Sequence, residues 1–204
     1  MALGDWSWSS SASLIDETPR SGELPSDYVV RLAEAKARAA AGLAGSEQYV
    51  VGADTAVADG RRLFGKPADA TDAVHMLRQL RGHSHQVYTG IAVLNLADQR
   101  VLTDLCITQV PMRSYAEPEI EEYVRSGDPL DKAGAYAIQH PGFRPVENLH
   151  GCYASVMGLP LCHLLRLLAR LNAAPQPDLP TQCQKHLQYA CPVSDAILRG
   201  EQVG

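Results

Sequence analysis

Hydrophobic positions recur at the spacing of an amphipathic helix in several parts of the chain. The first of these segments follows Ser26, a residue type suited to a helix N-cap, and the segments end near glycine or asparagine. We therefore predict helices over residues 27–41, 71–81 and 117–126, and a leucine-rich helix that ends near Leu171.

Shorter apolar runs, bounded by glycine, proline and aspartate, predict strands over residues 5–15, 49–53, 86–94 and 100–110. Asp59-Gly60 is a hairpin turn signal, and the strand before it is expected to end at Asp54-Thr55. The two longest runs are apolar on both faces, as in strands that helices cover from each side. The pattern therefore predicts an α/β fold with a central mixed, twisted sheet flanked by helices.

Length and composition bound the organisation of the chain. It has 204 residues, of which 46% are hydrophobic, so one domain with a sizeable core is expected. Several prolines follow Asn172, which predicts a domain over 1–172 and a C-terminal extension over 173–204. The formal net charge of -5 argues against binding to nucleic acid, because proteins that bind it gather Lys and Arg to neutralise phosphates.

The cysteine content and the longest apolar stretch bear on location. Five cysteines, an odd number in a chain too long to need disulfides, indicate a reducing compartment. The N-terminus lacks the basic region and apolar run of a signal peptide. The apolar stretch 159–171 is interrupted by His163, Arg166 and Arg170, so we expect no membrane span. These features predict a cytoplasmic protein.

Asp54 is the first candidate for chemistry, because it follows a buried strand and two small residues that let a phosphate or a metal approach the backbone. A carboxylate there can hold Mg²⁺, or orient and deprotonate an attacking water. The alternative is an ordinary turn residue between two strands.

Three other charged residues can act with Asp54. Lys66, in Gly65-Lys66-Pro67, lies on a loop that proline fixes and can hold a phosphate as a point charge, although most surface lysines have no specific role. Glu17 can supply a second carboxylate for a metal, and Lys36 falls one turn before the end of the predicted helix 27–41. A solvated lysine near a helix C-terminus and a turn residue are the alternatives.

A later segment, Pro129 to Tyr136, places Asp131 and Lys132 before a stretch of glycine and alanine. That composition suits a loop that closes over a phosphorylated ligand, or else a tight turn with an exposed ion pair. Gln139 can pair its amide with the edge of a base, or cap a strand.

In their order and spacing over about residues 1–171, these segments resemble the Maf family of nucleoside triphosphate pyrophosphatases, once called septum-formation inhibitors. The resemblance is carried by Asp16-Glu17-Thr18-Pro19, Tyr28 to Ala33 with Lys36-Ala37, Val51 to Thr55, Gly65-Lys66-Pro67, Asp131 to Gln139, and Gly151 to Leu161.

The resemblance implies cleavage of nucleoside triphosphates between the α and β phosphates, with a divalent metal cation, Mg²⁺ or Mn²⁺, as cofactor. It places the catalytic acid at Asp54, which together with Glu17 is expected to hold the metal. Thr55 and Gln139 match the branch that acts on dTTP and UTP rather than on 7-methyl-GTP. Lys36, Lys66 and Lys132 are expected to bind the substrate, and the resemblance also implies a homodimer.

The chain departs from the family pattern at its beginning. The family opens with a strand and a Ser-x-Ser-Pro-Arg-Arg loop that faces the triphosphate, and this motif is absent here. We therefore expect a Maf/ITPase-like sheet whose first strand and phosphate loop are missing, through a truncation or a start codon placed too far downstream. The family's Arg-Glu-Lys is Glu34-Ala35-Lys36, so Glu34 is not expected to replace the family's acid.

Two alternatives to the enzyme remain open. One is a catalytically impaired relative that binds nucleotides or regulates cell division. The other concerns the tail, where three side chains at suggestive spacing could bind zinc with Cys162, His163 or a partner subunit as the fourth ligand: Cys183, His186 and Cys191. For the tail we favour docking through four apolar side chains: Leu187, Tyr189, Ile197 and Leu198.

Overall fold

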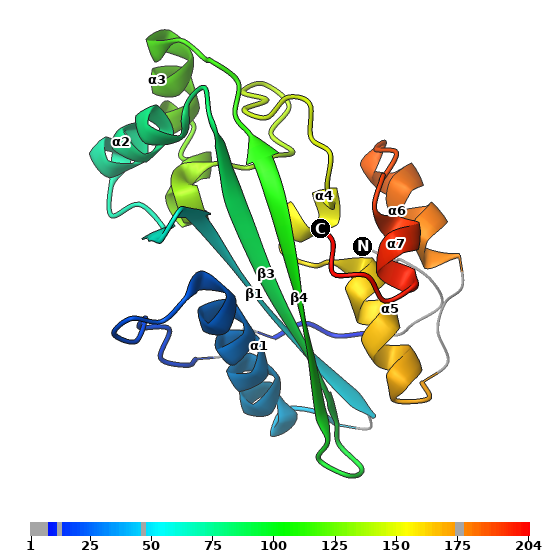
Figure 1. Cartoon of the computed structure of the whole chain (residues 1–204). Helices are drawn as coiled ribbons and strands as arrows, with labels where there is room; N and C mark the ends of the chain where they lie inside the picture. Colours follow the sequence, from blue (N-terminus) through cyan, green and yellow to red (C-terminus); the bar gives the residue numbers. More distant parts are fainter. Residues whose placement is uncertain (1–7, 12–13, 46–47, 174–177) are drawn as a thin grey trace.

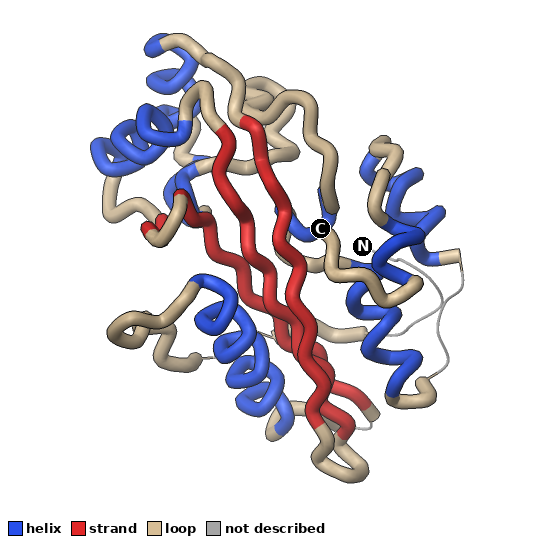
Figure 2. Tube along the Cα trace, in the orientation of Figure 1, coloured by secondary structure: helices blue, strands red, loops and turns tan. Residues whose placement is uncertain are grey.

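A four-stranded antiparallel sheet, in the order β2–β1–β3–β4, forms the centre of the chain (Figures 1 and 2). The structure is a computed structural model and describes residues 8–11, 14–45, 48–173 and 178–204. The strands are β1 (Tyr49–Asp59), β2 (Arg62–Phe64), β3 (Ser84–Asn95) and β4 (Val101–Pro111). The α/β class and the sheet flanked by helices are confirmed, and every pair of strands in the described sheet is antiparallel.

Helices cover the two faces of the sheet unequally (Figure 1). Among the described helices, α1 (Pro25–Ala41) alone covers one face, where it lies across β1 and β3. The other face carries the leucine-rich α5 (Leu161–Arg170), with α6 (Leu179–Leu187) and α7 (Ser194–Leu198) outside it. Leucines of α5 pack with Ile91 and Val93 of β3, which gives this face a continuous apolar core.

A second core fills one end of the sheet. It contains α2 (Ala70–Leu80), α3 (Glu117–Arg125) and two short 3₁₀-helices, η1 (Asp128–Asp131) and η2 (Ala133–Ala135). Aromatic rings join these elements: the rings of Tyr123 and Phe143 stack at 4.3 Å, and the hydroxyl of Tyr115 donates to the carbonyl of Leu77 at 2.6 Å. The short helix α4 (Tyr153–Val156) follows this region and leads into α5.

Two glycines let α1 approach the sheet closely. A side chain at Gly52 of β1 would collide with the carbonyl oxygen of Ala33, and a side chain at Gly90 of β3 would collide with that of Val29. Because both glycines face the helix, α1 lies nearly on the backbone of the two strands. This contact fixes the distance between α1 and every residue of β1 that points to the same face.

The predicted elements are largely confirmed, with three corrections. The strand that begins at Tyr49 does not end at Asp54-Thr55 but runs to Asp59, because the apolar alternation continues up to the predicted hairpin turn. The helix predicted after Ser26 begins at Pro25, and Ser26 does not cap it. The strand predicted over 5–15 is not formed at 8–11 or 14–15, and its remaining residues lie outside the described part of the chain.

The C-terminal segment packs onto the domain, as the docking interpretation predicts. Leu179 and Ile197 are fully buried, and the hydroxyl of Tyr189 donates to the carbonyls of Leu149 and Gly151. Leu198 was expected to pack but is 43% exposed, because α7 turns this side chain outward. Among the described helices, none combines the length and the apolar character needed to cross a membrane.

Candidate active site

Three charged side chains from three separate elements meet beside β1. The ammonium group of Lys36, on α1, lies 2.5 Å from Asp54 Oδ1 and 2.8 Å from Glu17 Oε1. Asp54 is 8% exposed, Lys36 22% and Glu17 50%, so the cluster runs from the interior of the domain to the solvent. The structure thus brings the catalytic candidate, Asp54, together with the two residues expected to act with it, the cation of Lys36 and the carboxylate of Glu17.

The position of Asp54 follows from the pleat of β1. Side chains alternate between the two faces of a strand, so Asp54 points to the same face as Gly52, toward α1. Gly52 in turn lets α1 approach, which brings the long side chain of Lys36 within hydrogen-bonding distance of Asp54. A carboxylate in the middle of a strand is therefore buried and still reaches a cation.

The segment that carries Glu17 is tied to α1 by two residues of that helix. The hydroxyl of Tyr28 donates to the Glu17 carbonyl at 2.9 Å. The guanidinium of Arg31 donates to both carboxylate oxygens of Glu23, at 2.6 and 2.8 Å, and also to the Thr18 carbonyl at 3.3 Å. Arg31 holds the pKa of Glu23 down at about 2, so this carboxylate stays charged. The Glu17 side chain is therefore presented from an anchored segment.

Burial and charge act against each other within the cluster. Burial raises the pKa of Asp54 above its usual range and Glu17 adds to the rise, whereas the hydrogen bond from Lys36 opposes it. For Lys36, burial alone would lower the pKa, but the hydrogen bonds to Asp54 and Glu17 outweigh it, so the net shift is upward. Lys36 accordingly remains a cation at neutral pH, and Asp54 is a stronger base than an exposed aspartate.

The cluster lies at an open edge of the sheet. β2 pairs only with residues 57–59 of β1, so in the described sheet residues 49–56 have no strand partner on that side. Phe64 of β2 lies opposite Val57, and the chain then runs on to Gly65 and Lys66. Since strands rise about 3.3 Å per residue, Val57 is only about 10 Å from Asp54 along β1.

Lys66 and Lys132 belong to two loops that contact each other. The amide of Gly134 donates to the carbonyl of Gly65 at 3.1 Å. Lys132 forms ion pairs with Asp128 at 3.1 Å and Asp131 at 2.7 Å, which is the exposed ion pair weighed as an alternative for this segment. Lys66 is exposed beside this group. The structure therefore places the two lysines together at the β1 edge, apart from the Lys36–Asp54 contact.

Thr55 and Gln139, the two predicted base-selecting residues, lie elsewhere. Thr55 points to the opposite face of the sheet from Asp54, where its hydroxyl lies 3.0 Å from that of Thr89, and Thr89 donates to the Ser155 carbonyl. Gln139 is exposed in a turn after η2. Thr55 belongs to the part of β1 that has no strand partner beside it in the described sheet, next to Asp54 along the strand.

Glu34 does not join the cluster, as expected. Its carboxylate accepts from Arg38 at 2.8 Å, an ion pair along the exposed side of α1. In contrast, our sequence analysis assigned no role to Tyr28 or Arg31. Tyr28 and Arg31 are three residues apart on α1, the spacing of neighbours on one helix face, and this was the signal that could have grouped them.

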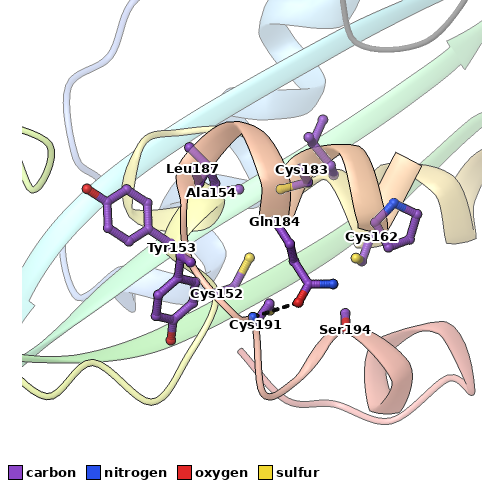
Figure 3. Close-up of a pocket in the computed structure, with 12 residues that line it drawn as sticks. Cys152, Tyr153, Ala154, Cys162, Cys183, Gln184, Leu187, Cys191 and Ser194 are labelled. Carbon is purple, nitrogen blue, oxygen red and sulfur yellow. Dashed lines mark hydrogen bonds between the residues drawn. The ribbon is translucent and has the colours of Figure 1, made fainter. Parts of the chain in front are cut away.

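Thiols gather away from this site, between α4, α5 and α6. Four cysteines line a cavity with a volume of about 10 Å³ (Figure 3): Cys152, Cys162, Cys183 and Cys191. Within the described residues, no three Cys, His, Asp or Glu side chains are arranged to hold a metal ion. His186 is exposed and His163 is fully buried in α5, so the zinc alternative is not supported.

Comparison with known proteins gives a consistent result. The family profile described as "Maf-like protein" matches residues 3–171. A "dTTP/UTP pyrophosphatase" of Pelotomaculum thermopropionicum is 44% identical over 158 residues, which cover 78% of this chain and 82% of the relative. The same name is given to a relative from Geobacter sulfurreducens, 44% identical over 162 residues, which cover 79% of this chain and 84% of the relative. A third, from Clostridium botulinum strain Kyoto, is 43% identical over 149 residues, covering 72% and 77%.

Proposed function

Because the chain belongs to the Maf family, we propose that it is a nucleoside triphosphate pyrophosphatase that hydrolyses dTTP and UTP, or modified relatives of them, to the monophosphate and pyrophosphate. One observation carries the proposal: the buried carboxylate of Asp54 contacts the ammonium group of Lys36, and the carboxylate of Glu17 contacts the same group. Relatives that share more than two thirds of the chain carry the name of this activity.

The chemistry of the proposed reaction suits the cluster. Hydrolysis of a phosphoanhydride needs a positioned water and neutralised phosphate charge more than it needs covalent catalysis. Burial raises the pKa of Asp54, so this carboxylate can accept a proton from the attacking water. As the proton moves to Asp54, the water oxygen bonds to the α-phosphorus, the bond between the α-phosphorus and the bridging oxygen breaks, and pyrophosphate leaves. Lys36 stays protonated beside it and offers positive charge to the phosphates.

The donor set also fits a divalent cation. Mg²⁺ is held by one or two carboxylates together with substrate phosphates and water. The Glu17 and Asp54 carboxylates each contact the Lys36 ammonium group through one oxygen, so their other oxygens are the ones assigned to a metal beside it. Mg²⁺ or Mn²⁺ bound by these two residues would neutralise the triphosphate and lower the pKa of a bound water.

The remaining substrate contacts follow from the open edge of β1. Lys66 and Lys132 lie on the loops at that edge and are assigned to the phosphates distant from Asp54. Thr55, on the unpaired part of β1, and Gln139 are assigned to the base. We further propose that the catalytic unit spans residues 1–172, that it acts as a homodimer, and that it works in the cytoplasm.

The proposal is tested by pyrophosphate release from dTTP, UTP, CTP, GTP and 7-methyl-GTP, with Mg²⁺, with Mn²⁺ and with EDTA. We expect release that depends on the metal and is fastest with dTTP and UTP. Binding of these nucleotides without release would instead favour a non-catalytic relative. Equal release by the wild-type chain and Asp54→Asn would overturn the assignment of Asp54.

A further inference from the structure

A second pocket lies at the outer edge of β4, between α5 and the segment that follows α7. Its volume is about 580 Å³. This is within the range of about 300–1,000 Å³ that small-molecule sites occupy. Residues 103–105 of β4 form one side and Val30 of α1 contributes to the rim. Figure 1 shows the elements around it, with α5 and α7 packed beside β4.

Positive charge dominates the lining of this pocket. Three guanidinium groups line it, from Arg166, Arg170 and Arg199, against one carboxylate, from Asp104. Asp104 is already occupied, because it accepts two hydrogen bonds from Arg166 at 2.7 and 2.8 Å. The excess positive charge therefore comes from Arg170 and Arg199, in a chain whose net charge is -5.

The two outer arginines differ in their partners. Arg199 forms an ion pair with Glu201, in which both side chains are more than half exposed, and such pairs stabilise little and exchange readily. Arg170 lies in the last turn of α5, one turn after Arg166 on the same side of the helix. Within the described part of the chain, no carboxylate lies within ion-pair distance of Arg170.

Arg166 makes the pocket rigid. It is 12% exposed, and besides Asp104 it donates to the carbonyls of Ile197 and Glu201. One side chain therefore joins α5, β4 and the C-terminal segment, so the walls are fixed before a ligand arrives. Three apolar side chains complete the lining, from Val30, Leu105 and Leu198.

We propose that this pocket binds a phosphorylated small molecule, with its phosphate on Arg170 and Arg199 and its non-polar part against Leu105 and Leu198. Guanidinium groups match the geometry of phosphate oxygens, and a pocket of this size admits more than an inorganic ion. Leu105 lies two strands from Asp54, in the register row Asp54, Gly90 and Leu105, and none of Glu17, Lys36 and Asp54 lines the pocket, so the two sites share no residue of the charged cluster.

The proposal is tested by amide chemical-shift mapping of the full chain at about 150 mM salt, the ionic strength at which exposed charges are well screened. The probes are UMP, inorganic pyrophosphate and uridine, each without metal. We expect UMP and pyrophosphate to shift Thr103, Leu105 and Gly200, and uridine to leave them unchanged. The readout is local, so it does not depend on whether the proposed hydrolysis takes place.

Variants sharpen the test. Combining Arg170→Glu with Arg199→Glu should weaken binding at Thr103 and Gly200 by at least about tenfold, which is the change expected from about 1.4 kcal/mol. Arg125→Glu is the matched control, because Arg125 is also exposed in the last turn of a helix. This variant should bind UMP and pyrophosphate as tightly as the wild type. If the double reversal disturbs folding, Arg170→Gln with Arg199→Gln replaces it.

Three results would overturn the proposal. The first is a set of shifts confined to the neighbours of Asp54. The second is unchanged binding at Thr103 in the double variant. The third is an equal response to sodium sulfate at the same ionic strength, which would show an adventitious ion only.

Discussion

The ammonium group of Lys36 lies 2.5 Å from the carboxylate of Asp54, so the one nearly buried acid on β1 is matched by a cation from the helix above it. The contact exists because α1 lies against the backbone of β1 at Gly52. Packing and chemistry are therefore linked: whatever moves α1 also moves the charge that Asp54 needs.

Replacing Asp54 by Asn should abolish most of the activity and leave the fold intact. The amide has nearly the size of the carboxylate but cannot accept a proton from water, so kcat/KM for dTTP should fall by about 10²–10⁴. Pyrophosphate release measures the loss, and circular dichroism measures the fold. Asp59→Asn is the matched control, because Asp59 is an exposed residue of the same strand. A similar loss in both variants would contradict a specific role for Asp54.

Removal of the cation should make both stability and activity depend on pH in a defined direction. Without Lys36, in Lys36→Met, the pKa of Asp54 should rise further above its unfolded value of 3.8, because burial is no longer opposed. The folded state then binds a proton more tightly than the unfolded chain. Stability of the variant relative to wild type should therefore fall as pH rises from 3.8 through the raised pKa of Asp54.

Two measurements check this expectation for Lys36→Met. Urea unfolding should show a loss of about 1–3 kcal/mol at pH 8 that shrinks at pH 5. The acidic limb of the pH profile of kcat/KM should move to higher pH. Lys185→Met, at an exposed position of α6, should change neither quantity. A loss of stability that is the same at both pH values would show that Asp54 is not the group left without a partner.

Arg31 should affect metal affinity more than it affects the fold. It clamps Glu23 and the Thr18 carbonyl, so Arg31→Ala should release the segment that presents Glu17. We expect the Mg²⁺ concentration for half-maximal activity to rise by about tenfold, the lower end of the range of about 10–100-fold that outer-shell partners control. The control is Arg38→Ala, which removes an exposed ion pair from the same helix. Equal Mg²⁺ requirements in the two variants would contradict a role of Arg31 in holding the Glu17 segment.

The close approach of α1 at Gly52 should be sensitive to a single methyl group. A β-carbon there would collide with the Ala33 carbonyl and lie 2.6 Å from the Ala37 amide nitrogen, so Gly52→Ala must push the helix outward. We expect a loss of about 1–3 kcal/mol in urea unfolding, together with reduced activity as Lys36 withdraws from Asp54. Gly42→Ala, where nothing lies within 4 Å, should change stability by less than about 0.5 kcal/mol.

Much of the fold follows from the sequence pattern, because the helices and strands have strong periodicity. The helices predicted over 71–81 and 117–126 appear as α2 and α3 with shifts of one residue at their ends. The end of β1 was misplaced, because the buried strand was expected to end at Asp54-Thr55. In the structure Gly52 is small because α1 packs on it, a tertiary reason that local sequence does not show.

The site could be predicted only in part. The resemblance named Glu17, Lys36 and Asp54, and the structure brings them into contact. The direction of Thr55 was not foreseen, although it follows from the alternation of β1 once Asp54 is known to lie within the strand. The roles of Lys66, Lys132 and Gln139 remain predictions, because their side chains reach a nucleotide only if it binds along the β1 edge.

Two buried histidines should make the protein sensitive to acid. Burial lowers the pKa of His163 to about 4, and it also lowers that of His85 to about 4, with His83 adding to the effect and Asp59 opposing it. Both rings are therefore neutral in the folded state at a pH where the unfolded chain, with a pKa near 6.5, is protonated. Between pH 6.5 and 4 the unfolded state binds more protons, so stability should fall as pH falls through this window.

The contribution of His163 can be separated by substitution. His163 lies in the leucine-rich α5, so His163→Leu should keep the packing and remove about 3 kcal/mol of the stability lost between pH 6.5 and 4. Urea unfolding at several pH values measures the slope. His75→Gln, at an exposed position of α2, should leave the slope unchanged. A slope that is identical in the wild type and His163→Leu would mean that His163 does not stay neutral in the folded protein.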